Sequence, residues 1–244
     1  MTTVVVLAEP PVPGETLPEL QEMLTPAGAN SLYTAMLGDV CEVVQHGEAD
    51  LLVNYPQSDR VPEGVDPEAA LREAVEPAVP APADVRYEVQ VGSTTAAQVG
   101  NALTHLLDTE RVETGGVVEP TVPFLRREHV GSAAMKLRSS AVVVGPATGG
   151  RVAFAAFREP IDFTDVFGPP AVETLTDRAV GAGHEVDFLP VLPRIETADD
   201  LAGAAPILRA RAAAGRLVPE RTAAVIEELN PFGEKSRAEQ SDSS

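Results

Sequence analysis

The sequence of 244 residues predicts an α/β protein in which a mixed, mostly parallel sheet carries helices on both faces. The first observation is the continuous apolar run 4–7, which is typical of a strand buried on both sides. The second is the alternation of strand-like and helix-like segments as far as residue 189. The third is the pair Gly149-Gly150 between two apolar segments, a hairpin pattern that makes part of the sheet antiparallel.

The strand-like segments are short and rich in valine, and they occupy residues 4–7, 51–53, 85–91, 116–119, 141–144, 151–157 and 185–189. The segment 85–91 alternates apolar and polar side chains, which predicts a strand with one exposed face. The helix-like segments repeat apolar residues three and four positions apart, and they occupy residues 26–46, 67–75, 96–107, 125–137 and 169–182. Thr25 and Pro26 supply a cap and a first position for the first of these helices.

The chain changes character after residue 201, where two helix-like segments, 204–214 and 219–229, follow without a further strand. We therefore expect three parts: an α/β domain over residues 1–202, a helical extension over 203–232, and a polar, acidic tail over 233–244. The tail holds too few apolar residues to build a core, which predicts disorder.

The charge of the chain is strongly negative, with 37 acidic residues against 18 basic ones and a net charge of −19. Such a surface repels polyanions, so the composition excludes nucleic acid as a partner. No apolar run reaches the length of about 20 residues that spans a bilayer, which excludes a membrane span. Excess Asp and Glu with few lysines is typical of proteins from salt-rich cytoplasm, where dense salt screens self-repulsion. We therefore predict a halophilic protein.

The thiol content and the start of the chain favour the cytoplasm. Cys41 is the single cysteine, so an internal disulfide and a cysteine-based zinc site are both excluded. The sequence enters its first strand without a basic leader, which predicts that no signal peptide is present. Cys41 falls within the helix expected over 26–46, where a small buried hydrophobic side chain is its predicted role.

Residues 4–14 resemble the first strand and loop of the radical-SAM/selenodomain-associated transferases, a group of candidate sugar transferases with the glycosyltransferase-A (GT-A) fold. The phospholactate guanylyltransferases are similar at a greater distance. The helix from Pro26 fits without a gap, and the segment 143–150 resembles the strand and turn that end in Asp-Gly-Gly in the family. The segments 172–175 and 195–201 follow in the same order, so the resemblance covers about residues 4–202.

The resemblance implies a three-layer, nucleotide-diphosphosugar-transferase-like fold and a glycosyl or nucleotidyl transferase acting on a nucleotide sugar. An active member would use a divalent cation, Mg²⁺ or Mn²⁺, to neutralise the diphosphate leaving group. Glu119 lies two residues from the position of the family's metal-binding Asp and is the candidate metal ligand. The candidate substrate-binding residues lie in the two glycine-containing turns and are Pro13, Gly14, Thr16, Thr148, Gly149 and Gly150.

The positions that carry chemistry in the family are changed here. Leu17 and Glu19 stand where the family has a Lys and an Arg that would hold phosphates, and Glu19 supplies the opposite charge. Thr121 and Thr148 replace two aspartates, and Ala102 aligns with a family Arg. The packing positions are kept while the phosphate- and metal-binding positions have diverged, and no catalytic residue can be assigned from the sequence.

Each candidate also has a purely structural interpretation. The loop after the first strand is either a ligand-binding loop or a rigid surface turn. Gly149-Gly150 is either a place where a substrate comes close to the bare backbone or a hairpin turn that needs positive φ. Glu119 is either a metal ligand or an ordinary acid at a strand end. Asp199-Asp200 is typical of a helix start, and Arg126-Arg127 of a solvated helix face.

Two classes of function therefore remain open. The first is a transferase-like enzyme whose partner is a nucleotide sugar. The second is a catalytically inactive homologue that serves as a binding or regulatory module. In the second case the C-terminal helices either pack on the sheet or form a partner surface, with a homodimer as the predicted assembly.

Overall fold

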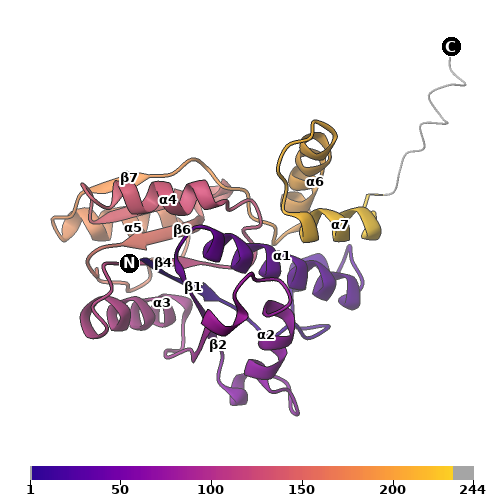
Figure 1. Cartoon of the computed structure of the whole chain (residues 1–244), viewed down its shortest axis with the longest axis horizontal. Helices are drawn as coiled ribbons and strands as arrows, with labels where there is room; N and C mark the ends of the chain where they lie inside the picture. The colour runs from indigo at the N-terminus through magenta and orange to yellow at the C-terminus, as the bar shows by residue number, and fades with distance from the viewer. Residues whose placement is uncertain (1, 233–244) are drawn as a thin grey trace, which may run out of the picture.

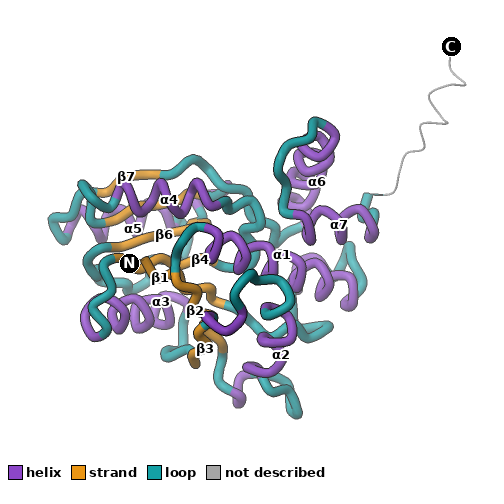
Figure 2. Tube along the Cα trace, in the orientation of Figure 1, coloured by secondary structure: helices purple, strands orange, loops and turns teal. Residues whose placement is uncertain are grey.

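The computed structural model describes residues 2–232, which form a seven-stranded sheet flanked by helices (Figure 1). The strands are β1 (Thr2–Leu7), β2 (Asp50–Tyr55), β3 (Arg86–Val89), β4 (Thr114–Val118), β5 (Val142–Pro146), β6 (Val152–Phe157) and β7 (Val186–Phe188). Each predicted strand is therefore present, with its bounds shifted by a few residues at most. Figure 2 shows the strands as one layer with helices on both sides of it.

The strand order is β3-β2-β1-β4-β6-β5-β7. The pairs β1–β2, β2–β3, β1–β4 and β5–β7 are parallel, whereas β6 runs antiparallel to both β4 and β5. This arrangement confirms the predicted mixed, mostly parallel sheet and its antiparallel part around Gly149-Gly150. Because β2 and β4 lie on opposite sides of β1, the chain changes direction across the sheet at β1, and α/β folds bind ligands beside such a point.

The helices follow the predicted order, and short helical turns connect them. The α-helices are α1 (Pro26–His46), α2 (Pro67–Val75), α3 (Thr95–Thr104), α4 (Arg127–Lys136), α5 (Ala171–Gly181), α6 (Ala198–Ala213) and α7 (Glu220–Leu229). The short turns are η1 (Pro18–Leu20), η2 (Ser58–Arg60), η3 (Pro82–Asp84), the π-helical η4 (His105–Thr109) and η5 (Thr148–Gly150). Thr25 caps α1 as predicted, because its side chain accepts a hydrogen bond from the Gly28 N–H.

Two apolar cores lie on opposite faces of the sheet. Along β1, Val4 and Val6 point to one core and Val5 to the other, as the period of two in a strand requires. The larger core is closed by α1, α2, α4, α6 and α7, and the smaller one by α3 and α5. Cys41 is fully buried in the larger core, as predicted, and burial raises the pKa of its thiol.

Strand β4 lies at the centre of the sheet, although its two glycines give the sequence only a weak strand pattern there. A Cβ atom on Gly115 would lie 3.0 Å from the Leu103 side chain, and one on Gly116 would lie 3.2 Å from the Phe154 ring. The glycines therefore allow the Leu103 side chain of α3 on one face, and the Phe154 ring of the neighbouring β6 on the other, to pack closely against the strand.

The C-terminal helices pack against α1. Buried Asp39 on α1 accepts hydrogen bonds at the start of α7 from the Thr222 N–H (2.8 Å) and hydroxyl (2.7 Å). Helix α6 begins at Ala198, earlier than the predicted 204, because Thr197 and Asp200 form a capping box. The predicted domain boundary at residue 202 falls inside α6, so a division there remains a prediction. The predicted tail over 233–244 lies outside the described residues.

The C-terminal apolar residues divide between the core and the surface. Leu208 and Ile226 are buried, whereas Ile207 and Leu217 are 45% and 74% exposed. Of the two predicted uses of these helices, packing on the domain is therefore observed, and a homodimer through the exposed residues remains a prediction. Among the described residues, no helix combines the length and the hydropathy that a transmembrane segment needs.

Candidate functional site

A cleft of about 420 Å³ lies at the carboxyl ends of β1, β3 and β4. Leu7 and Glu9 enter it from the end of β1, Gln90 from the end of β3, and Glu119 from the end of β4. Parallel strands present these ends at the same edge of the sheet, and β1 is where the strand order reverses. Both facts make this cleft the candidate ligand site.

The cleft takes in some of the residues predicted from the sequence and leaves out others. Thr16 and Glu119 line it, as do Leu17 and Glu19, the two positions where the resemblance predicts a Lys and an Arg. Pro13 and Gly14 belong to the same loop but do not line the cleft, and neither do the three residues of η5, Thr148–Gly150. Whether any of these residues binds a substrate remains a prediction.

The loop after β1 is held as a defined turn. The Gln21 side chain donates hydrogen bonds to the backbone carbonyls of Gly14 and Thr16, both 3.0 Å long, and the Thr16 hydroxyl donates to Asn30 on α1 (3.2 Å). Leu17 is buried and adopts φ +46°, a left-handed conformation that is unusual for leucine. The rigid turn and the cleft-lining position coexist, so neither of the two interpretations of this loop excludes the other.

Gly149 and Gly150 adopt φ values of +72° and +71°, which L-residues rarely reach. They join β5 to the antiparallel β6, as the hairpin interpretation requires. The preceding Thr148 accepts hydrogen bonds from Arg151 through its carbonyl (3.1 Å) and its hydroxyl (3.3 Å). This turn therefore positions Arg151, whose guanidinium reaches toward the cleft wall.

Buried Tyr33 on α1 fixes the backbone at the end of β1. Its hydroxyl accepts a hydrogen bond from the Glu9 N–H (2.8 Å) and donates one to the Glu9 carbonyl (3.1 Å). Both bonds go to the same residue, so the start of the cleft-lining loop has a single orientation relative to α1. Burial of Tyr33 raises the pKa of its hydroxyl, which therefore stays a neutral donor at the cleft wall.

The main feature of the site is an ionic network at the floor of the cleft. Arg194, in the loop after β7, donates hydrogen bonds to both Glu119 and Glu196. A further bond runs from Arg194 to the Val152 carbonyl (2.8 Å), and its side chain is only 9% exposed. Partial burial of Glu119 in the cleft raises the pKa of its carboxyl, and Arg194 opposes this rise.

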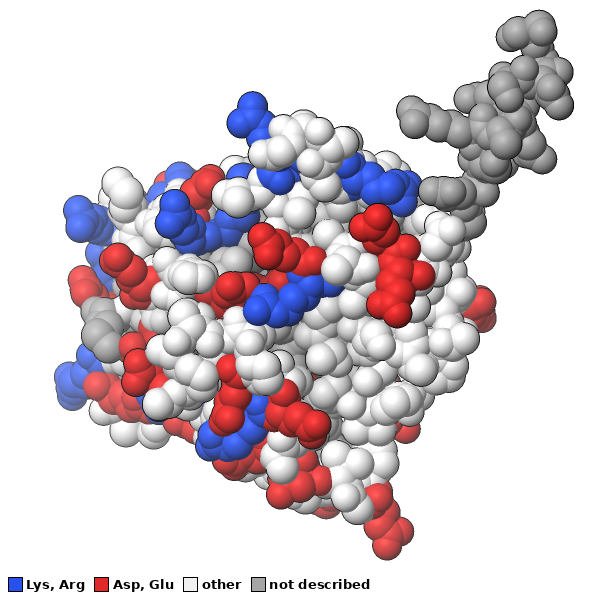
Figure 3. Space-filling model, turned by 45° about the vertical axis from the view of Figure 1, so that its right-hand side comes forward, with Lys and Arg blue, Asp and Glu red and all other residues white. Residues whose placement is uncertain are grey.

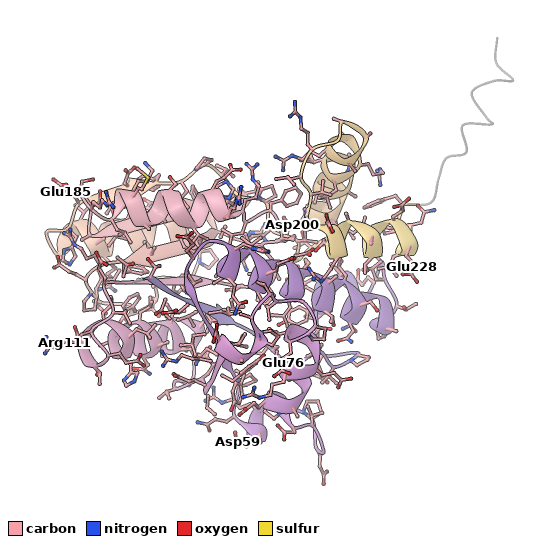
Figure 4. The ribbon with its side chains drawn as sticks, viewed as in Figure 1. Asp59, Glu76, Arg111, Glu185, Asp200 and Glu228 are labelled. Carbon is pink, nitrogen blue, oxygen red and sulfur yellow. The ribbon has the colours of Figure 1, made fainter. Side chains whose placement is uncertain are left out.

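A second arginine extends this network to α6. Arg151 donates to Glu196 (2.7 Å) and, through two nitrogens, to Asp200 (2.9 and 2.6 Å). Figure 4 places Asp200 at the end of α6 that lies nearer the sheet. Burial raises the pKa of the Asp200 carboxyl, but the hydrogen bonds from Arg151 and from backbone N–H groups outweigh it, and the pKa is lowered. Asp200 is thus both the predicted helix start and a member of the site.

The carboxylates of this floor do not form a divalent-metal centre. Glu119 and Glu196 both contact the guanidinium of Arg194, which occupies the position between them that a cation would need. Thr121, at the position where the resemblance predicts an Asp, donates its hydroxyl hydrogen bond to Glu196 (3.1 Å). Within residues 2–232, no group of three or more His, Cys, Asp or Glu side chains is arranged to hold a metal. The residues present therefore do not fit Mg²⁺ or Mn²⁺.

The cleft lining is acidic, and the arginines that balance Glu119 and Glu196 lie behind the lining. Its carboxylates are Glu9, Glu15, Glu19, Glu119 and Glu196, and none of the described residues that line it is Lys or Arg. The remaining polar lining consists of hydroxyls and amides from Thr16, Thr95, Thr121, Gln90, Gln98 and Tyr33. The surface presented to a ligand thus accepts hydrogen bonds at many points and repels anions.

Sequence reasoning missed Arg194, Glu196 and Arg151. Arg194 and Glu119 are 75 residues apart, and no local pattern links them. The segment 195–201 resembles the family, but that resemblance gives no indication that Glu196 faces the cleft. Tyr33 lies in the helix expected over 26–46, whose pattern indicates only that it is buried. That its hydroxyl makes hydrogen bonds could have been inferred, because buried tyrosines usually find a partner.

Neither a protein-family model nor a curated protein matches this chain. Solved structures do match it. A candidate nucleotide-diphospho-sugar transferase from Desulfovibrio desulfuricans G20 is 20% identical, with 94% of this chain and 95% of that chain covered and a TM-score of 0.76.

Two further structures are similar at lower scores. CMP:2-keto-3-deoxy-manno-octonic acid synthetase, complexed with CTP, is 11% identical, with 86% of this chain and 99% of that chain covered and a TM-score of 0.52. A cytidylyltransferase from Leptospira borgpetersenii is 10% identical, with 94% of each chain covered and a TM-score of 0.53. At these identities the likeness establishes the fold alone. The chain has the mixed α/β fold of nucleotide-diphosphosugar-transferase-like proteins.

Proposed function

We propose that this chain is a diverged homologue of nucleotide-sugar and nucleotidyl transferases, of the radical-SAM-associated type that its sequence resembles. In this proposal its cleft binds an uncharged, hydroxyl-rich ligand, such as a sugar, and does not perform metal-dependent diphosphate transfer. The observation that carries the proposal is the contact of Arg194 with both Glu119 and Glu196. In this proposal the positive charge between Glu119 and Glu196 comes from the Arg194 side chain and not from a metal ion.

The electrostatics of the cleft support this choice of ligand. A diphosphate needs positive charge and hydrogen-bond donors, but the lining contributes five carboxylates and no free cation among its described residues. Two like charges about 4 Å apart repel by about 1 kcal/mol in water and about 4 kcal/mol at the dielectric of a protein surface. This repulsion disfavours a diphosphate that enters the cleft without a cation.

The same residues are suited to hydroxyl groups. Carboxylates accept hydrogen bonds only, so Glu9, Glu15 and Glu19 can each receive hydroxyl donors from a polyol. Gln98 and Thr95, on the opposite wall at the start of α3, can both donate and accept. This donor and acceptor pattern is complementary to a neutral sugar and to the sugar part of a nucleotide sugar alike.

Calorimetric titration tests the proposal with two ligand sets at matched concentrations. One set contains neutral monosaccharides and methyl glycosides, and the other contains UDP, GDP and GDP-mannose with Mn²⁺. We expect heat and a raised melting temperature from a member of the neutral set, lost on changing Glu15 and Glu19 to alanine. Binding confined to the nucleotides with Mn²⁺, or no binding in either set, would contradict the proposal.

The second candidate is an active nucleotidyl or glycosyl transferase. The likeness of this fold to a synthetase whose structure contains CTP favours it, together with a cleft at the point where the strand order reverses. A divalent ion would then have to displace Arg194 from Glu119 and Glu196. A nucleotide affinity that depends on Mn²⁺ and falls in Glu119→Gln would establish this candidate in place of the first.

A further inference from the structure

A second cavity, of about 330 Å³, lies between α1, the start of α4 and the loop that joins α6 to α7. It shares no lining residue with the cleft at the carboxyl ends of the strands. Val43, Phe124, Leu217 and Val218 give it apolar walls. The cavity exists because the segment from the end of α6 to the start of α7 packs over α1 and the start of α4, so residues on both sides of position 202 line it.

Three arginines line this cavity: Arg126, Arg127 and Arg211. The whole chain has 18 basic residues and a net charge of −19, so three cations around one small cavity stand out against the composition. In Figure 3 basic side chains are more frequent on the side of the molecule from which α6 projects. The sequence alone predicts only a solvated helix face for Arg126 and Arg127.

These arginines have little to bind within residues 2–232. The side chains of Arg127 and Arg211 make no hydrogen bond or ion pair there, and the Arg126 guanidinium has only the exposed Glu128 carboxylate at 3.7 Å. The buried Nε of Arg126 also lacks a hydrogen-bond partner. Arginines elsewhere in the fold, such as Arg194 and Arg151, are held by two or more carboxylates.

The acidic residues of the cavity do not cancel this charge. Asp39 is occupied by the Thr222 N–H and hydroxyl, and Glu42 forms an ion pair with Arg221 (2.6 Å). Glu128 and Glu220 are exposed at the rim, where water screens them. Nε2 of the exposed His46 lies 3.6 Å from a carboxylate oxygen of Glu42.

His129 is buried in the first turn of α4, close to the arginines of the cavity. Its Nδ1 accepts a hydrogen bond from the Arg126 N–H (3.1 Å), which fixes the ring as a neutral imidazole at that nitrogen. Burial lowers the pKa of His129 first, and the positive charges of Arg126 and Arg211 lower it further, against the opposing effect of Glu128. Arg126 and Arg211 therefore lie close enough to the first turn of α4 to act on a charge there.

We propose that this cavity binds a small organic oxyanion, a carboxylate or a phosphate, carried on an apolar body. Arg127 and Arg211 supply planar forks that match both kinds of oxyanion. The positive end of α4 adds to the attraction, because the backbone N–H groups of Arg127 and Glu128 have no acceptor within the described residues. Val43 and Val218 then cover the apolar body.

Calorimetric titration with hexyl phosphate, hexanoate and hexanol tests this inference. We expect binding of at least one of the two anions and none of hexanol, and the tighter anion identifies the headgroup. Arg127→Ala with Arg211→Ala should weaken binding about tenfold or more, since it removes the charge-assisted hydrogen bonds that the two guanidinium groups would donate to the anion. Both side chains lack partners in the described part of the fold, so the double variant should keep the wild-type melting temperature.

Arg209→Ala is the matched control, because Arg209 is an exposed arginine of the same helix that does not line the cavity. It should leave the affinity unchanged. Equal binding of hexanol, full affinity in the double variant, an equal loss in the control, or no binding of either anion would each overturn the inference. These outcomes are independent of the sugar titration, because the two sites have no residue in common.

Discussion

The guanidinium of Arg194 lies against the carboxylate of Glu119 at the floor of the cleft, and the two residues are 75 positions apart in the chain. Glu119 follows β4 directly, and Arg194 comes from the loop beyond β7. The contact therefore joins the end of a central strand to the loop that follows the edge strand β7, and in the proposed function Arg194 stands where a metal ion would otherwise be needed.

Removal of Arg194 should destabilise the protein. Arg194→Ala leaves Glu119 without its cation and Glu196 with Arg151 alone, and breaking a buried ion pair on one side costs about 3–5 kcal/mol. Because the two carboxylates are 32% and 27% exposed, we expect roughly 2–3 kcal/mol here. Urea unfolding measures the loss. Arg138→Ala, an exposed arginine, serves as control, and a loss of the same size there would contradict the role of the network.

The pH dependence of stability should carry opposite slopes for two acids of the network. The pKa of Glu119 is raised above its ordinary 4.5, so its contribution is present below pH 4.5 and is lost as the pH rises through the folded pKa. Wild-type stability relative to Glu119→Gln should therefore fall as the pH rises above 4.5.

The pKa of Asp200 is lowered below 3.8, so its contribution is present above pH 3.8 and is lost as the pH falls through the folded pKa. Wild-type stability relative to Asp200→Asn should therefore rise with pH in that acidic range. Urea unfolding at a series of pH values measures both differences, and parallel slopes for the two pairs would refute this assignment.

The Tyr33 hydroxyl should matter for the shape of the cleft as well as for stability. Tyr33→Phe removes both hydrogen bonds to the Glu9 backbone at constant ring packing, at a cost of about 1–2 kcal/mol. Amide hydrogen exchange should show faster exchange at Glu9 and in the loop that follows. An unchanged exchange rate there would mean that the hydroxyl does not hold this segment.

Salt should stabilise the fold. A net charge of −19 produces self-repulsion, and the screening length falls from about 10 Å at 0.1 M salt to about 3 Å at 1 M. We expect the melting temperature to rise across this range of KCl, with a smaller rise in a variant that has several exposed glutamates changed to glutamine. A melting temperature that is the same in dilute buffer and in concentrated KCl would remove the basis for a halophilic protein.

The fold could be predicted largely from local patterns. The apolar run 4–6 predicts a strand that is buried on both faces of a parallel sheet, and its side chains do enter both cores. The start of α1 is marked by Thr25 and Pro26. The start of α6 is the exception. Asp200 is typical of a helix start, but the apolar repeat alone predicts the helix only from residue 204, whereas α6 begins at Ala198.

The site could be predicted only in part, because its chemistry depends on side chains that meet through the fold. Glu119 and Thr16 could be found from their place after a strand. The partner of Glu119 could not, since Arg194 reaches it only through the order of the strands across the sheet. Neither the charge of the cleft nor the three arginines of the second cavity corresponds to a sequence motif.

In the proposed function Arg194 takes the place of a metal ion in the cleft, so the binding of Mn²⁺ to the wild-type protein decides between this function and a metal-dependent one. Electron paramagnetic resonance of free Mn²⁺, with a nucleotide sugar present and concentrated KCl to suppress weak surface binding, counts the tightly bound ions. We predict none for the wild-type protein. One Mn²⁺ per chain, lost in Glu119→Gln, would contradict the claim.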